Sequence, residues 1–172
     1  MISAVIVTVS DSCFQGRRQD LSGPAIASIL KAQGFAVEAP VIVSDDLQAI
    51  GDALRQSAAR ALLVVTTGGT GIGPRDVTPE ATRAACDRLL EGVSERMRAA
   101  GIAETPYAAL SRALCGTLGT SLVLNLPGSP RGAVTSLNAV LPLVRHALDL
   151  LAGNTEHPAE SRAPKNHDGA AG

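Results

Sequence analysis

The stretch Thr66-Thr-Gly-Gly-Thr-Gly-Ile-Gly-Pro-Arg-Asp-Val-Thr-Pro-Glu80 decides the fold, because it joins a strand to a helix through a glycine-rich loop. The apolar run that precedes it, Ala61-Leu-Leu-Val-Val65, predicts a buried strand. Its last residues predict a helix start, with Thr78 as the N-cap, proline at the first helical position and an acid in the first turn. The stretch is therefore typical of a strand–loop–helix unit.

The same alternation of strand and helix continues along the chain in both directions. Apolar runs predict strands over residues 2–9, 35–43, 61–67 and 121–126. Helical patterns cover residues 24–33, 47–59, 79–88, 94–100 and 130–152. This order predicts an α/β fold in which βαβ units build a doubly wound sheet. Its core must be aliphatic, because 45% of the residues are hydrophobic but only 2% are aromatic.

Length and composition argue against several classes of protein. The 172 residues suit one domain, which we place at 1–152, followed by a polar tail over 153–172 that we expect to be disordered. A formal net charge of −1 without a basic face argues against a nucleic-acid partner. No apolar run approaches the ~20 residues that span a bilayer, and the N-terminus has no signal-peptide pattern. Three cysteines without CxxC spacing indicate reduced thiols, so we expect a cytoplasmic protein with no membrane partner.

The glycine-rich loop over residues 68–76 indicates a phosphate site. Glycines leave backbone N–H groups open to close approach by an anion, and they permit the positive φ values that let such groups converge. Arg75 would add a charge-assisted donor, and Asp76, which has no evident packing use, would be free to hold a metal that bridges to phosphate. The loop is not a P-loop, because no Gly-Lys-Ser/Thr follows it. An ordinary surface turn is the alternative.

Polar residues follow all four predicted strands. In open α/β sheets, ligands bind beyond the carboxyl ends of the strands, so we expect these ends to form one crevice. It would be lined from residues 8–12, 44–46, 68–76 and 125–130. Asp45 and Asp76 would both be available for Mg²⁺, which is typically held by one or two carboxylates plus substrate phosphates. Helix capping is the alternative for Asp45 and for Ser129.

Taken together, the motifs resemble the molybdopterin-binding MogA/MoaB family, which includes bacterial molybdopterin adenylyltransferases and gephyrin G-domains. The combination is specific, whereas Gly-Gly-Thr-Gly alone would be weak. The matching pieces occur in the family's order and are Thr8-Val-Ser-Asp11, Asp20-Leu-Ser-Gly-Pro24, Ser44-Asp-Asp46, Thr67-Gly-Gly-Thr-Gly71, Pro74-Arg-Asp-Val-Thr-Pro-Glu80, Ala109-Leu-Ser-Arg112 and Leu124-Asn-Leu-Pro-Gly128.

The resemblance implies a three-layer fold, with a mainly parallel central sheet flanked by helices, and a homotrimer. It implies transfer of AMP from ATP onto the terminal phosphate of molybdopterin, with Mg²⁺ and release of pyrophosphate. The product would pass to a MoeA-like molybdate-insertion protein. Asp76 and Asp45 match the acids taken as catalytic in the family. The matching binding positions are Ser10, Asp11, Gly68, Gly69, Thr70, Gly71, Ser111, Asn125, Pro127 and Gly128.

Two further residues are predicted to bind the ligand because of their positions in the loops. Arg75 belongs to the glycine-rich loop, and Ser129 stands where many family members are expected to carry Asn or Gln. Two functions remain open: a Mg-ATP-dependent adenylyltransferase, and a non-catalytic module that binds molybdopterin and delivers it to a partner. Retention of both Asp45 and Asp76 favours the enzyme, because a pure binder need not keep them. A third interpretation is a molybdate-insertion enzyme. The absence of further domains in 172 residues argues against it.

Overall fold

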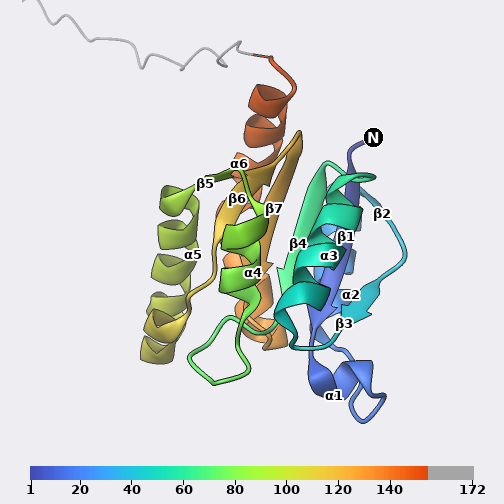
Figure 1. Cartoon of the computed structure of the whole chain (residues 1–172). Coiled ribbons are helices and arrows are strands. Elements are labelled where there is room, and N and C mark those ends of the chain that lie inside the picture. The colour runs from blue at the N-terminus through green and yellow to red at the C-terminus, as the bar shows by residue number, and fades with distance from the viewer. Residues whose placement is uncertain (155–172) are drawn as a thin grey trace, which may run out of the picture.

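The computed structural model describes residues 1–154 and contains one mixed sheet of seven strands (Figure 1). The strands are β1 (Ser3–Val9), β2 (Ala36–Val37), β3 (Val41–Val43), β4 (Leu63–Thr67), β5 (Arg88–Leu89), β6 (Cys115–Leu118) and β7 (Ser121–Leu126). Their order across the sheet is β2-β1-β4-β7-β6-β5, and β3 also pairs with β1. All pairs are parallel except β5 with β6 and β6 with β7. The predicted α/β fold with a mainly parallel sheet is confirmed.

Helices cover both faces of the sheet and complete the three layers. They are α1 (Asp11–Phe14), α2 (Ser22–Ala32), α3 (Leu47–Ala58), α4 (Thr78–Ala85), α5 (Glu91–Glu104), the short 3₁₀ helix η1 (Pro106–Leu110) and α6 (Pro130–Leu151). Figure 1 shows α3 and α4 in front of the sheet and α6 behind it. Helix α2 packs with α6 on the far face, and α5 packs against α6 beside the antiparallel edge.

Alternate residues of the central strands face the two helical layers. On β1, Ile6 belongs to the core shared with α2 and α6, whereas Val5 and Val7 belong to the core shared with α3. All three are at most 2% exposed. Because helices cover both faces, the strand is a continuous apolar run and does not alternate with polar residues.

The register of the parallel strands brings their carboxyl ends to one edge. Thr8 of β1 pairs with Thr67 of β4, and Thr67 pairs with Leu126 of β7. On the other side of β1, Val9 pairs with Val43 of β3. The segments that follow these four strands therefore leave the sheet at the same level.

Several predicted element boundaries are wrong. The strand predicted over 35–43 is two short strands, β2 and β3, which pair with different parts of β1. The helix predicted over 94–100 is longer at both ends, because α5 runs from Glu91 to Glu104 and continues through Gly101. Thr78 is not an N-cap: it lies inside α4, and its hydroxyl donates to the Gly68 carbonyl at 2.9 Å. The short elements α1, β5, β6 and η1 were not predicted, because two to five residues carry too little periodicity to identify them.

No helix within residues 1–154 is long and apolar enough to cross a membrane. The domain predicted over 1–152 ends close to the end of α6 at Leu151. The predicted polar tail, apart from Gly153 and Asn154, lies outside the described residues.

Asn125 of β7 is a buried polar link between three elements. It is 0% exposed, and its amide nitrogen donates to the hydroxyls of Thr66 on β4 and Thr82 on α4, at 3.0 and 2.9 Å. Its side-chain oxygen accepts from the N–H of Leu114 at 3.2 Å. Because each hydrogen bond satisfies a buried or half-buried group, the side chain fixes α4 and the segment before β6 against the sheet.

We expect Asn125→Ala to lower the free energy of unfolding by about 2–4 kcal/mol, because it leaves several polar groups without partners. Urea denaturation followed by circular dichroism measures this loss. Asn138→Ala, at an exposed position on α6, is the matched control and should change stability by less than about 0.5 kcal/mol. Equal effects of the two substitutions would contradict the assigned role.

Candidate active site

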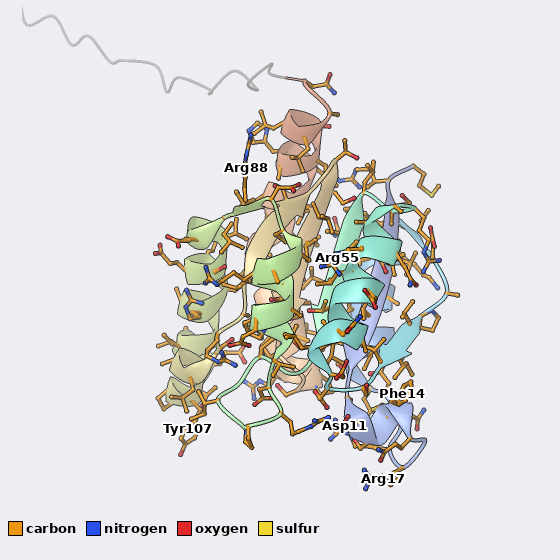
Figure 2. All side chains as sticks on the ribbon, viewed as in Figure 1. Asp11, Phe14, Arg17, Arg55, Arg88 and Tyr107 are labelled. Atoms are coloured by element: carbon orange, nitrogen blue, oxygen red, sulfur yellow. The ribbon has the colours of Figure 1, made fainter. Side chains whose placement is uncertain are left out.

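The segments that follow β1, β3, β4 and β7 gather at the carboxyl edge of the sheet, as predicted. Figure 2 shows Asp11 at this end of the molecule and Tyr107 on the other side of the glycine-rich loop. Arg88 lies at the opposite end of the molecule. The edge is therefore bounded by α1 on one side and by η1 on the other.

The first two residues of the glycine-rich loop require glycine. Gly68 and Gly69 have φ values of 102° and 63°, in the left-handed region. A Cβ on Gly68 would lie 2.2 Å from the carbonyl oxygen of Val9, and one on Gly69 would lie 2.4 Å from the Thr78 hydroxyl. The loop backbone therefore packs directly against the end of β1 and the start of α4, and these contacts leave no room for a side chain at either position. None of the hydrogen bonds among the described residues uses the N–H groups of Gly69, Thr70 and Gly71.

Asp45 lies against this loop and is held by a reciprocal pair of hydrogen bonds with Asp11. The N–H of Asp11 donates to the Asp45 carboxylate at 2.7 Å, and the N–H of Asp45 donates to the Asp11 carboxylate at 3.0 Å. The second Asp45 oxygen would lie 3.3 Å from a Cβ on Gly69. The capping alternative for Asp45 is wrong, because Asp46 caps α3 by accepting from the N–H of Ala49.

The carboxyl groups of Asp45 and Asp11 are shifted in opposite directions. Burial raises the pKa of Asp45, and the negative charges of Asp11 and Asp76 add to this shift. The N–H of Asp45, followed by the Arg75 guanidinium, holds the pKa of Asp11 below its ordinary value. A cation beside Asp45 would favour its ionised form, which burial disfavours.

Arg75 forms a two-pronged ion pair with Asp11. Its Nε and Nη2 atoms donate to the two carboxylate oxygens at distances of 2.9–3.1 Å. Asp11 and the pair's guanidinium are at the surface, and the Arg75 side chain is 64% exposed. The residue predicted as a phosphate donor is therefore paired with a carboxylate of α1.

Asp76 closes the glycine-rich loop. Its carboxylate accepts from the N–H of Gly73 at 2.8 Å and would lie 2.8 Å from a Cβ on Gly71. Glycines at 71 and 73 therefore leave room for this side chain to fold back over the loop. Asp45 and Asp76 flank the loop near its two ends.

Arg112 is the site residue that the sequence interpretation did not assign. Its guanidinium donates to the carbonyl of Gly71 at 2.7 Å, to that of Asp76 at 2.6 Å, and to the carboxylate of Glu80. The Arg112 hydrogen bond holds the pKa of Glu80 below its ordinary value. The motif Ala109–Arg112 was the available signal, but nothing in the sequence indicates which loop this arginine reaches.

A cavity of about 520 Å³ opens between the glycine-rich loop, α5, η1 and the start of α6. This volume lies within the ~300–1,000 Å³ of small-molecule sites. Its walls combine apolar side chains such as Met97 and Leu110 with charged ones such as Arg98, Glu104 and Arg131. The predicted site residues that line it are Gly69, Thr70, Gly71, Asp76, Ser111, Pro127, Gly128 and Ser129.

The other predicted site residues do not line this cavity. Asp45, Ser10 and the Asp11–Arg75 pair lie on the α1 side of the glycine-rich loop. Asn125 lies buried beneath it, and its amide nitrogen donates to the hydroxyls of Thr66 and Thr82. The structure therefore divides the predicted set between the cavity, the α1 side of the loop and the sheet below.

Two predicted binding serines cap helices. The Ser129 hydroxyl accepts from the N–H of Gly132 at 3.2 Å, which confirms the capping alternative for this residue. The Ser10 hydroxyl accepts from the N–H of Cys13 at 3.3 Å. Each serine therefore fixes the start of a helix beside the site.

Cys86 and Cys115 do not belong to the site. Burial raises the pKa of Cys86 to about 11 and that of Cys115 to about 12. Both thiols therefore stay protonated at neutral pH, and neither residue lines the cavity. Nor do residues 1–154 contain a cluster of three or more His, Cys, Asp or Glu side chains that could hold a metal ion. A metal at Asp45 and Asp76 would need further ligands from a substrate.

The fold and the site define an α/β protein with a small-molecule site at the carboxyl edge of its sheet. A family described as "Probable molybdopterin binding domain" matches residues 5–146. The chain belongs to this molybdopterin-binding domain family, which confirms the resemblance stated from the sequence.

Similar proteins cover most of the chain. It is 38% identical over 156 residues to molybdopterin adenylyltransferase of Helicobacter pylori, with 87% of each chain covered. It is 37% identical over 172 residues to the molybdenum cofactor synthesis protein cinnamon of Drosophila melanogaster, covering 94% of this chain but only 28% of that protein. The molybdopterin biosynthesis enzyme MoaB of Thermus thermophilus is similar in structure, with a TM-score of 0.84 and 49% identity over 89% of this chain and 98% of that chain.

We expect Gly68→Ala to lower the free energy of unfolding by about 3 kcal/mol or more, because the new methyl group would collide with the backbone of Val9. Gly16→Ala is the matched control: Gly16 has a φ of 70°, but no atom lies within 4 Å of its Cβ position. It should cost only the conformational strain, about 1 kcal/mol. Thermal and urea unfolding of both variants measure the difference, and a similar loss in each would contradict the close contact.

We expect the stability difference between the wild type and Glu80→Gln to depend on pH. The folded-state pKa of Glu80 is lowered, so its pairing with Arg112 stabilises the fold above the unfolded pKa of about 4.3 and is lost as pH falls through the folded pKa. The melting temperature of the wild type should exceed that of the variant at pH 7, and the gap should close on acidification. Glu95→Gln, at an exposed position on α5, should show no such convergence.

Proposed function

We propose that this protein is a molybdopterin adenylyltransferase of molybdenum cofactor biosynthesis. The proposal rests on one observation: two carboxylates from different loops, Asp45 and Asp76, flank a glycine-rich loop whose N–H groups adjoin a cavity of about 520 Å³. Membership of the molybdopterin-binding family and the similarity to the Helicobacter pylori enzyme support the same activity.

The reaction moves AMP from ATP to the terminal phosphate of molybdopterin. A phosphate oxygen of molybdopterin forms a bond to the α-phosphorus of ATP, while the bond from that phosphorus to the bridging oxygen breaks. The electron pair leaves with pyrophosphate. Such a transfer needs positioning and charge neutralisation more than a covalent protein nucleophile, which agrees with a cavity lined by no cysteine of residues 1–154.

The residues of the loop have distinct roles in this proposal. The N–H groups of Gly69, Thr70 and Gly71 bind phosphate oxygens and stabilise the charge that develops during the transfer. Arg75, which extends from the loop to Asp11, adds a cation beside the phosphates. The cavity between α5 and α6 takes the pterin, with Ser111 and the 127–129 turn on its walls. ATP then occupies the α1 side of the loop.

The donor set fits Mg²⁺. Asp45 contacts the loop at Gly69 and Asp76 contacts it at Gly71 and Gly73, so two carboxylates adjoin the loop. One or two carboxylates are the usual protein contribution to a magnesium site completed by substrate phosphates. A bound Mg²⁺ would neutralise phosphate charge. Asp45 and Asp76 would hold it and keep the two substrates in register. A homotrimer, a cytoplasmic location and transfer of the product to a MoeA-like partner stay predictions from the resemblance.

We expect Asp76→Asn to reduce AMP transfer by at least about a hundredfold while molybdopterin binding stays within about threefold of the wild type. Asparagine keeps the acceptor for the N–H of Gly73, so the loop should stay folded while its negative charge is lost. The assay combines purified protein, molybdopterin, Mg²⁺ and labelled ATP, and measures adenylylated pterin. Unchanged turnover would remove Asp76 from the mechanism.

Asp52→Asn is the control for loss of an acid, because Asp52 is an exposed residue of α3 that pairs with Arg55. It should leave turnover unchanged. The same assay separates the two functions left open by the sequence. A wild-type protein that binds molybdopterin tightly but forms no adenylylated product would be a delivery module, not an enzyme.

A further inference from the structure

Arg112 makes hydrogen bonds to the glycine-rich loop through both its main chain and its side chain. It lies two residues after the end of η1 at Leu110, between Ser111 and Ala113 of the cavity wall, and its side chain is 37% exposed. Its main-chain N–H donates to the carbonyl of Thr70 at 2.9 Å. Its guanidinium then bonds the carbonyls of Gly71 and Asp76 and the carboxylate of Glu80. One residue therefore contacts the loop at its start, at its end and at the helix that follows.

Two of the three acceptors of the guanidinium are carbonyls of the loop, and the third is the Glu80 carboxylate of α4. Nε bonds Gly71 at 2.7 Å and Nη2 bonds Asp76 at 2.6 Å, so the two atoms together set the separation of positions 71 and 76. A planar guanidinium has five donors in a fixed fork and can make these bonds at once, whereas a lysine ammonium is a point charge without that fork. Glu80 fixes the third corner of the guanidinium from the first turn of α4.

We infer that Arg112 is a positioning residue for adenylyl transfer, acting through the glycine-rich loop and Asp76. This inference rests on the proposed function. With its carbonyls bonded to Arg112, the loop is constrained to present its N–H groups and the Asp76 carboxylate toward the substrates. The backbone carbonyl of Asp76 is held by Arg112, and its carboxylate is held by the N–H of Gly73, so both ends of this residue are fixed.

The expected effect follows from the sensitivity of transfer reactions to geometry. A displacement of about 1 Å at a reacting group can cost about a hundredfold in rate, even when binding of the substrate persists. Replacing the Arg112 guanidinium should therefore lower mainly kcat. The molybdopterin cavity has further walls from α5, η1 and α6 that do not depend on Arg112, so pterin binding should be largely kept.

The test compares Arg112→Lys with the wild type in the adenylyl-transfer assay. We expect kcat to fall about tenfold or more, while the dissociation constant for molybdopterin changes by less than about threefold. Glu80→Gln, which removes the charge at one corner of the guanidinium but keeps an acceptor, should cause a smaller fall. Arg96→Lys is the matched control, because Arg96 also donates to a main-chain carbonyl, that of Ala139, but on the outer helices and away from the cavity.

A second measurement separates positioning from folding. Millimolar guanidinium ion added to Arg112→Ala should restore part of the lost kcat, because it can occupy the same three acceptors, whereas it should not restore Asp76→Asn. A kcat for Arg112→Lys within about twofold of the wild type would overturn the inference. So would a parallel loss of kcat, pterin binding and melting temperature, since that is the signature of a purely structural arginine. If the wild type itself forms no adenylylated pterin, the proposed function fails. That result differs from the two that overturn the role of Arg112, because both of those require an active wild type.

Discussion

The in-register parallel pairing of β1, β4 and β7 is the constraint on which the rest of the structure depends. Because Thr8, Thr67 and Leu126 lie at one level, the segments after these strands are forced into a common edge. The close contact of Gly68 with the carbonyl of Val9 exists only in this register. A slip of one residue would turn each core side chain to the other face and would separate the glycine-rich loop from Asp45.

The glycine-rich loop is held in place by a small number of hydrogen bonds and ion pairs from both of its sides. Asp11 and Asp45 hold each other through their main-chain N–H groups, and Arg75 ties this pair to the loop. On the opposite side, Arg112 holds the loop by its carbonyls. The loop is thus supported from α1 and from the η1 side, while the N–H groups between Gly69 and Gly71 stay available for anions.

Much of the fold and part of the site could be predicted from the sequence, for physical reasons. The strands β1, β4 and β7 are mostly apolar runs, and Asp76 is a carboxylate in a glycine-rich loop, where the sequence alone offers it no packing partner. Short elements such as β6, with its Cys-Gly-Thr-Leu sequence, carry no such period. Asn125 was predicted as a binding residue, but its burial and its hydrogen bonds to two threonines depend on tertiary neighbours that no local pattern identifies. The hydrogen bonds from Arg112 to Gly71 and Asp76 could not be predicted for the same reason, because they join residues more than thirty positions apart in the sequence.

The ion pair between Arg75 and Asp11 means that the site carries its own internal counterion. The positive charge of Arg75 is already paired with a carboxylate, so in the proposed reaction an incoming polyphosphate would compete with Asp11 for the same guanidinium. Affinity is then set by an exchange of one anion for another, and not by the full attraction of a bare cation. Such an exchange favours ligands that carry enough negative charge, or an accompanying cation, to displace Asp11, and it discriminates against weakly charged ones.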